Sequence, residues 1–496
     1  MRLALRYPVA SFLCGYVVLV GAWVLANPPS AAPDEPAHYV KAVAAGGLEF
    51  LGPQPAVVGD EEMRANARVA RYVSIPARFD PGPFGCTAFA SKLPAGCLDA
   101  AFPPRAGRSV VAWSGLATYP PFLYVLPGLV MRYAADRVSA LYLGRAVFAV
   151  LALAMLAAGL ALLGAGARAA GWLVGPLVAL SPMVVFVFST LSASSAEIAA
   201  GFACAGAALH FGHQQRVPRR GFWLLAAGSG AVLSLSRPLG PVWVGLLATV
   251  AVGLRGRAPT AAALRAGGRC SQAGLALVGL TSVAELVWHA AVQPRASYPS
   301  LGSMIHLFIH DLDRVPHLLN EQVGVFGWLD TQMPPFVYTL WQAVLVSVIT
   351  LAMLGATQRQ RWVLGLCVAA WLVSAPAMTA LLSGTLGGVS QARWALPFTL
   401  VVPLLAGDVL AHSAPPLTEP GRQRPLVALA VLTSAIQVIA FWSNAQRYAV
   451  GKNGPTWYFP HTAWAPPVGW VGPSIAVLLG ACAIVVITSR SRERYT

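Results

Sequence analysis

The stretch VASFLCGYVVLVGAWVLA, residues 9–26, decides the fold. It contains no charged side chain and approaches the ~20 residues that a helix needs to cross a bilayer. A cleaved signal peptide is the alternative, but the run is long for one and the Pro-rich stretch 27–29 follows it. We therefore expect an uncleaved first helix. Either way, the chain after Asn27 lies outside.

Apolar runs of similar length recur along most of the chain. Of its 496 residues, 57% are hydrophobic and 10% are charged, whereas soluble domains average roughly 25% charged residues. That composition excludes an ordinary soluble globule, a disordered protein and a disulfide-rich scaffold. The sequence predicts an all-α integral membrane protein with the lipid bilayer as its surroundings.

The net charge of +16 follows the expected membrane topology. Arginines cluster between apolar runs, as they do in cytoplasmic loops under the positive-inside rule. No basic patch is interleaved with aromatic residues for base stacking, so we expect anionic lipid headgroups, and no nucleic acid, as partners. The clearest clusters are Arg216/Arg219/Arg220 and Arg490/Arg492/Arg494.

With these arginine clusters on the cytoplasmic side, the chain is expected to cross the cell membrane about twelve times as a multi-pass protein. Both termini are then cytoplasmic. After the first helix we expect spans at 141–166, 171–190, 197–212, 222–236, 238–254, 271–290, 336–356, 362–383, 394–411, 425–441 and 468–488. The chain divides into the first helix (1–26), extracytoplasmic loop 1 (27–139), a transmembrane core (140–291), an outer loop (292–335) and C-terminal transmembrane helices (336–496).

A shorter apolar stretch, Tyr119–Tyr133, lies inside loop 1. As a span it would invert every later loop and place the arginine clusters outside. It is also short for a bilayer. We interpret it as a juxtamembrane helix, interfacial or re-entrant, packed on the outer face.

Only two of the seven cysteines, Cys86 and Cys97, share an outer loop. Extracytoplasmic compartments permit disulfides, and closing a loop of this size contributes about 3 kcal/mol in the entropic description. We predict a disulfide. Two unpaired thiols are the alternative, because spacing alone does not establish pairing.

The motif PDEPAHY, residues 33–39, lies immediately outside the first helix. Asp34 and Glu35, flanked by prolines, form a stiff turn at the membrane surface. A partly desolvated carboxylate there can act as a general base, and His38 can orient it or help to hold a cation. The alternative is an N-cap for a helix over 38–45.

This motif resembles a bacterial membrane-protein family called DUF2142. Three further stretches match its pattern, in order, over about residues 10 to 410. They are Tyr119-Pro120-Pro121, the box Gly327-Trp328-Leu329-Asp330-Thr331 with Pro334, and Gln391-Ala392-Arg393-Trp394 with Pro397, where Arg-Trp replaces the Arg-Tyr of the family's Gly-Arg-Tyr box.

DUF2142 is grouped with the GT-C glycosyltransferases, membrane enzymes that use polyprenyl-phosphate sugars. The resemblance implies a GT-C-like fold, catalytic acids at Asp34 and Glu35, and a juxtamembrane helix at Tyr119. It also implies a second acidic site at Glu197, where many members carry Asp. The implied activity is transfer of a sugar from a polyprenyl-phosphate donor to a cell-envelope polysaccharide or glycolipid.

The chemistry of such a donor fits the residues. The donor brings its own leaving group, and no dinucleotide-binding glycine motif occurs, so we expect no nucleotide cofactor. Asp34 would deprotonate the acceptor, while arginines at outer helix ends stabilise the departing phosphate, with or without a divalent metal ion. The candidates are Arg145, Arg237 and Arg393, for which snorkelling is the alternative.

Other polar residues give weaker indications. His306, His310 and Asp313, with Glu197, are weak metal-ligand candidates, and a solvated helix is the alternative reading of residues 306–313. Glu285 and His289 lie one turn apart in a span and are candidates to line a substrate channel. Asp330 we interpret as the N-cap of the following helix.

Two other functions stay open. A transporter or flippase for a lipid or polysaccharide would place polar residues near the bilayer midplane, on broken helices or inverted repeats. Here they collect in outer loops and at outer helix ends, which favours the enzyme. A catalytically silent assembly factor with the same fold is the third possibility.

Overall fold

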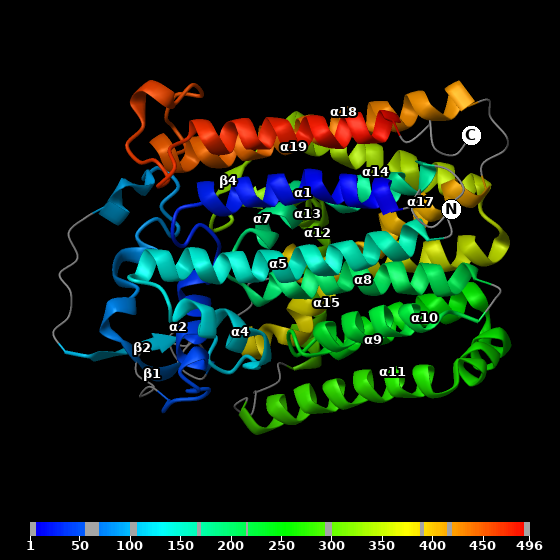
Figure 1. Cartoon of the computed structure of the whole chain (residues 1–496), viewed down its shortest axis with the longest axis horizontal. Coiled ribbons are helices and arrows are strands. Elements are labelled where there is room, and N and C mark those ends of the chain that lie inside the picture. Colours follow the sequence, from blue (N-terminus) through cyan, green and yellow to red (C-terminus); the bar gives the residue numbers. More distant parts are fainter. Residues whose placement is uncertain are drawn as a thin grey trace.

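The computed structural model describes residues 6–54, 69–99, 107–165, 170–214, 217–292, 300–386, 391–413 and 419–490. Arg216, Arg492 and Arg494 of the basic clusters lie outside the described residues. Long helices lie side by side in one bundle (Figure 1). They are α1 (Arg6–Ala26), α5 (Arg137–Gly164), α8 (Ala193–His213), α9 (Arg220–Ser234), α10 (Gly240–Arg255), α11 (Arg257–Val292), α14 (Pro335–Gly355), α15 (Gln358–Leu386), α17 (Val401–Ser413), α18 (Glu419–Val450) and α19 (Val471–Arg490).

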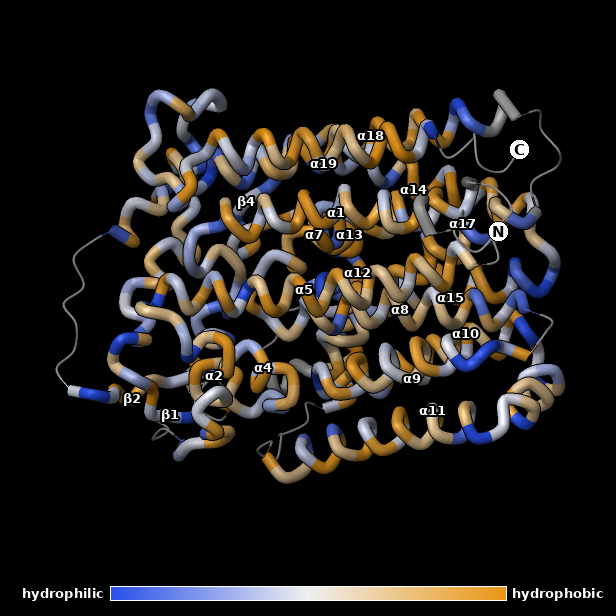
Figure 2. Tube along the Cα trace, in the orientation of Figure 1, coloured by the Kyte–Doolittle hydropathy of each residue, from blue (hydrophilic) through white to orange (hydrophobic). Residues whose placement is uncertain are grey.

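The helices are hydrophobic along their middles and more hydrophilic towards both ends of the bundle (Figure 2). The start of α1 and the end of α19 lie at one end, which we call the termini end (Figure 1). The opposite end, the loop end, carries most of loop 1. That loop forms α2 (Glu35–Gly46), α4 (Phe122–Met131) and an antiparallel pair of strands, β1 (Arg71–Pro76) and β2 (Ser109–Ser114).

Eight of the described helices are long and apolar enough to cross a membrane, or nine if one bent pair counts as a span. The predicted class, an all-α membrane protein, is therefore confirmed. Helices α9 and α10, with 15 and 16 residues, are shorter than the ~20 that a span needs. The number twelve stays a prediction.

The segment expected to form the span at 171–190 is broken into two helices. The chain forms α6 (Val174–Ala179) and α7 (Pro182–Phe188), bent by 67°. Pro182 has no N–H to continue the helix and disfavours helical geometry at the residue before it. A distant side chain satisfies one carbonyl at the break, because Gln437 Nε2 donates to the Leu180 carbonyl at 2.9 Å. Ser181 Oγ links the break to α13 by donating to the Gln322 carbonyl at 2.8 Å.

The apolar stretch near Tyr119 forms only α4, ten residues long. At ~1.5 Å per residue it spans about 15 Å, half of a bilayer core. It packs against α2 through Gly46 and Gly128, where a Cβ on either glycine would collide with the other's backbone. This close backbone contact makes α2 and α4 one rigid unit at the loop end.

The expected outer loop 292–335 contains α12 (Leu301–Asp313), α13 (Val315–Gly324) and the paired strands β3 (Val325–Phe326) and β4 (Thr331–Gln332). The N-cap interpretation of Asp330 is wrong, because Asp330 lies in the hairpin turn and Pro334 precedes α14. Its Oδ1 accepts a hydrogen bond from Thr331 Oγ1 at 2.9 Å.

A buried ion pair fixes the turn between α1 and α2. Arg145 on α5 donates to both carboxylate oxygens of Glu35, at 2.8 and 2.6 Å, and both side chains are at most 1% exposed. The same guanidinium donates to the carbonyls of Asn27 and Pro28, and the Leu191 N–H donates to Glu35. The pair therefore joins α5 to the α1–α2 turn and to the start of α8.

The first prediction concerns this pair. Glu35→Gln leaves the Arg145 charge buried without its counter-ion, which typically costs about 3–5 kcal/mol. We expect a clear loss of thermal stability in detergent, followed by size-exclusion chromatography after heating. The control is Glu49→Gln, since Glu49 accepts a hydrogen bond from the exposed Ser74 N–H and has no ion pair among the described residues. Equal stability of the two variants would contradict the prediction.

The second prediction concerns the disulfide. Cys86 and Cys97 are bonded in the structure, whereas Cys14 and Cys482 are free and exposed. A peptide map of the purified protein without reductant should contain the linked 86–97 pair, while Cys14 and Cys482 react with an alkylating reagent. Recovery of Cys86 and Cys97 as two alkylated thiols would show that the bond is absent.

Candidate functional site

Five of the predicted site residues, from distant parts of the chain, meet at the loop end. Each is placed by a different element: the turn before α2, the segment before α4, the first turns of α8, the turn between α9 and α10, and the short 3-10 helix Ala392–Ala395. We call these side chains the Asp34 cluster. They are Asp34, Tyr119, Glu197, Arg237 and Arg393.

Two arginine–carboxylate contacts and one aromatic ring connect the cluster. Arg393 Nη2 lies 3.7 Å from Asp34 Oδ2, and Arg237 Nη1 lies 3.7 Å from Glu197 Oε2. Arg237 Nη2 also donates to the Tyr119 hydroxyl at 3.2 Å, with its guanidinium carbon 5.1 Å from the ring centroid. Each arginine of the cluster therefore has one carboxylate partner, and Arg237 also contacts Tyr119.

Asp34 is the accessible carboxylate of the cluster. Its side chain is 44% exposed, whereas that of Glu197 is 2% exposed. It precedes α2 with φ 64°, in the left-handed region, and its side chain makes no capping hydrogen bond. The cap alternative is therefore wrong. A non-glycine residue held in this region is strained, and such strain concentrates at functional sites.

The two guanidiniums of the cluster keep unused donors. Arg237 and Arg393 are 10% and 8% exposed, and Nε of each is buried without a hydrogen-bond partner among the described residues. They are also close enough to repel each other. Each guanidinium has five N–H donors suited to carboxylate or phosphate. Two buried guanidiniums with unused donors are therefore chemically suited to an anion.

The Tyr119 side chain is neutral at physiological pH. Burial is the largest influence and raises the pKa of its hydroxyl, while the charge of Arg237 acts in the opposite direction. The hydroxyl oxygen accepts from Arg237, so its proton is free to be donated. Tyr119 thus adds a neutral hydrogen-bond donor beside the two cations.

His38 does not take the predicted substrate-binding role. It is 1% exposed, and both ring nitrogens are hydrogen-bonded, Nδ1 with the Tyr124 hydroxyl at 2.6 Å and Nε2 with Ser192 Oγ at 3.2 Å. Burial lowers the pKa of His38 well below its usual value, and the charges of Arg237 and Arg393 lower it further. A neutral His38 joins α2, α4 and the start of α8 behind the cluster.

Glu35 and Arg145 also differ from the prediction. They were expected to act as a catalytic acid and a phosphate ligand, but they bind each other and the neighbouring backbone. Both side chains are buried, and these contacts hold the turn that carries Asp34.

Sequence reasoning missed two buried supporting residues. Glu321 on α13 accepts the Ala392 N–H at 2.9 Å and thereby holds the turn that carries Arg393. Burial is the main cause that raises the pKa of Glu321. Lys41 on α2 donates to the carbonyls of Phe50 and Ala117, and burial lowers its pKa to about 8. A lysine within the apolar second half of α2, residues 40–46, was the signal for Lys41.

The metal candidates do not form a site. Among the described residues, no three His, Cys, Asp or Glu side chains gather in a way that could hold a metal ion. His306, His310 and Asp313 lie on α12, where His310 is 62% exposed and near Asp311. Glu285 on α11 is buried, and its carboxylate has no hydrogen-bond partner among the described residues. It lies near enough to Glu197 for the two charges to interact.

Comparison with known proteins finds a family match, and the matched segment contains the whole Asp34 cluster. Residues 17–402 match the family described as "Predicted membrane protein (DUF2142)". No curated protein and no solved structure matches the chain. The matched part includes all four motifs and every residue of the Asp34 cluster. The chain therefore belongs to the DUF2142 family of predicted membrane proteins.

Proposed function

We propose that the chain is a GT-C-type glycosyltransferase, which moves a sugar from a polyprenyl-phosphate donor to a cell-envelope polysaccharide or glycolipid. The observation that carries the proposal is the Asp34 cluster itself. An accessible carboxylate without a capping role faces two buried guanidiniums with unused donors. That combination suits a reaction that needs a base and releases a phosphate.

The loop end faces the outside of the cell in this proposal. The arginines of the α8–α9, α10–α11 and α14–α15 turns and the last residue of α19 lie at the termini end, which the positive-inside rule assigns to the cytoplasm. Described examples are Arg219, Arg220, Arg255, Arg257, Arg359, Arg361 and Arg490. A lipid-linked donor then reaches the cluster from the outer leaflet.

The arginines would act on the leaving group. Arg237 and Arg393 donate to the oxygens of the donor phosphate, and Tyr119 adds a neutral donor. As the bond between the anomeric carbon and the phosphate oxygen breaks, the bonding electrons pass to that oxygen. Buried guanidiniums stabilise the developing charge more strongly than water does, because they are already oriented. Glu197 holds Arg237 in place.

Asp34 would act on the acceptor. As the acceptor oxygen bonds to the anomeric carbon, its proton passes to the Asp34 carboxylate, and polyprenyl phosphate departs. The half-exposed position of Asp34 lets a water-soluble acceptor approach from the loop end while the donor lipid stays in the bilayer. The turn before α2 fixes the position from which Asp34 meets the acceptor.

A transporter is the second candidate, because α6 and α7 form a broken helix of the kind found at transporter binding sites. The break adjoins a cavity of about 370 Å³ lined mostly by apolar side chains, including Val178, Leu345 and Leu400. Gln437 satisfies the Leu180 carbonyl at the break, and Ser181 Oγ is occupied by the Gln322 carbonyl of α13. An apolar, already satisfied break gives a polar cargo little to bind, which favours the transferase.

The third prediction separates catalysis from structure at Asp34. General-base assistance typically contributes ~10²–10⁴-fold in rate. In a deletion strain, we expect Asp34→Asn to lose the envelope glycan that the wild-type gene restores, at equal protein level in the membrane. Asn tolerates the left-handed backbone conformation at least as well as Asp does, so folding should persist.

The matched control is Asp136→Asn, the same chemical change at the same end of the bundle. Asp136 caps α5 by accepting from the N–H groups of Val138 and Ser139, and Asn is an equally good cap. This variant should restore the glycan fully. A normal glycan profile with Asp34→Asn would contradict the proposed role of Asp34.

A further inference from the structure

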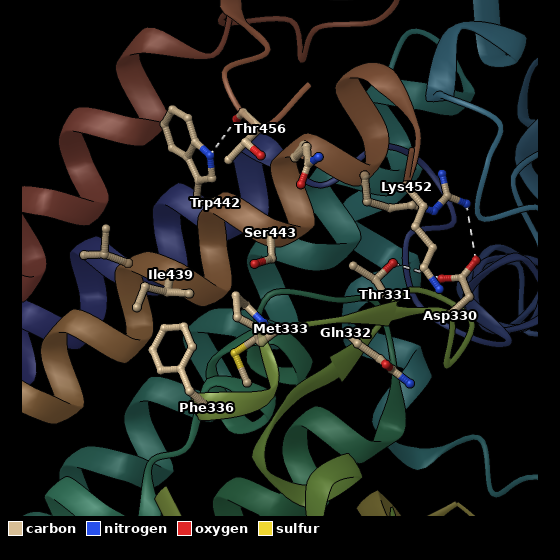
Figure 3. Close-up of a pocket in the computed structure, with 14 residues that line it drawn as sticks. Asp330, Thr331, Gln332, Met333, Phe336, Ile439, Trp442, Ser443, Lys452 and Thr456 are labelled. Carbon is tan, nitrogen blue, oxygen red and sulfur yellow. Dashed lines mark hydrogen bonds and ion pairs between the residues drawn. The ribbon is translucent and has the colours of Figure 1, made fainter. Parts of the chain in front are cut away.

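A cavity of about 620 Å³ lies at the loop end and shares no residue with the Asp34 cluster. Its walls are the turn and strand of the β3–β4 hairpin, the start of α14, the last turns of α18 and the segment after α18 (Figure 3). None of these segments contributes to the mechanism proposed above.

The cavity has an apolar side and a polar side. Met333, Phe336, Ile439 and Trp442 lie together on one side, while Asp330, Thr331 and Lys452 lie on the other (Figure 3). Phe336 is 55% exposed at the start of a membrane-crossing helix. The apolar side is thus open to the bilayer rather than enclosed by protein.

One positive charge on the polar side is not neutralised. Arg447 is 2% exposed and donates to the carbonyls of Thr87, Leu93 and Ala90, and its remaining contact is Asp330 Oδ2 at 3.3 Å. Asp330 and Arg447 therefore balance each other. The exposed Lys452 ammonium has no ion pair or side-chain hydrogen bond among the described residues.

The position of the cavity matches a membrane interface. Aromatic rings that contact one another run from the cavity wall at Trp442 into the segment after α18, a composition typical of the boundary between headgroups and acyl chains. They are Trp442, Trp457, Tyr458, Phe459, Trp464 and Trp470. At ~1.5 Å per residue, Val438 on the apolar side lies roughly 18 Å along the helix axis from the Val450 end of α18. That depth suits a headgroup together with the upper part of an acyl chain.

We propose that this cavity is a binding site for an anionic phospholipid of the leaflet at the loop end. The phosphate lies beside Lys452, where Gln332 and Gln446 supply neutral amide N–H donors, and one acyl chain lies along Phe336 and Ile439. Charge complementarity selects an anionic headgroup, and the apolar side selects a lipid over a soluble anion.

Native mass spectrometry of the full-length protein, purified from vesicles of equal parts phosphatidylglycerol and phosphatidylcholine, tests the proposal. We expect preferential retention of phosphatidylglycerol. A basic residue near a membrane surface contributes an amount equivalent to about five-fold in affinity, so Lys452→Gln should reduce the retained fraction by about that factor. Phe336→Ala should also reduce it, because the acyl contact is lost.

Lys92→Gln is the matched control, since Lys92 is exposed at the same end and does not line the cavity. It should leave lipid retention unchanged. Added inorganic phosphate or glycerol phosphate should not displace the lipid. Equal retention of the two lipids, equal effects of Lys452→Gln and Lys92→Gln, or displacement by soluble phosphate would each overturn the proposal. These outcomes are independent of the glycan profile that tests Asp34.

Discussion

The buried pair of Glu35 and Arg145 is the interaction on which the geometry of the loop end depends. Burying two charges is costly, and attraction compensates only when the remaining hydrogen-bonding groups are satisfied. Here the bidentate contact, two carbonyls and one N–H fulfil that condition. Neighbouring residues at a helix start point about 100° apart, so holding Glu35 inside the bundle directs Asp34 elsewhere.

The candidate site follows from that constraint. Asp34 lies over Arg393, which reaches it from a turn held by Glu321, and Arg237 reaches Tyr119 from between two helices. Every element of the site is thus anchored by buried polar contacts that lie behind it. The site itself keeps an accessible carboxylate and unused guanidinium donors. The residues whose hydrogen bonds are satisfied hold the structure, and different residues keep groups that are free to react.

Sequence patterns predicted the membrane class and the juxtamembrane helix, and the family resemblance with the expected chemistry named Asp34, Glu197, Arg237 and Arg393 as site residues. They failed where neighbours in sequence have different partners in space. The pattern treats Asp34 and Glu35 alike, because only the position of Arg145 distinguishes them. The break at Pro182 was visible in the sequence, but its acceptance inside the bundle depends on Gln437, far along the chain. Long-range pairing of polar side chains has no local signature.

The central claim is that the Asp34 cluster binds the phosphate of a lipid-linked donor. Photo-crosslinking in membranes with a polyprenyl-phosphate probe, carrying a diazirine beside the phosphate and mapped by peptide mass spectrometry, tests that claim most directly. The account predicts labelled peptides around residues 34–39, 119–124 and 391–396, and loss of this labelling in an Arg237→Gln/Arg393→Gln double variant. Labelling confined to the cavity beside Lys452, or unchanged in the double variant, would contradict it.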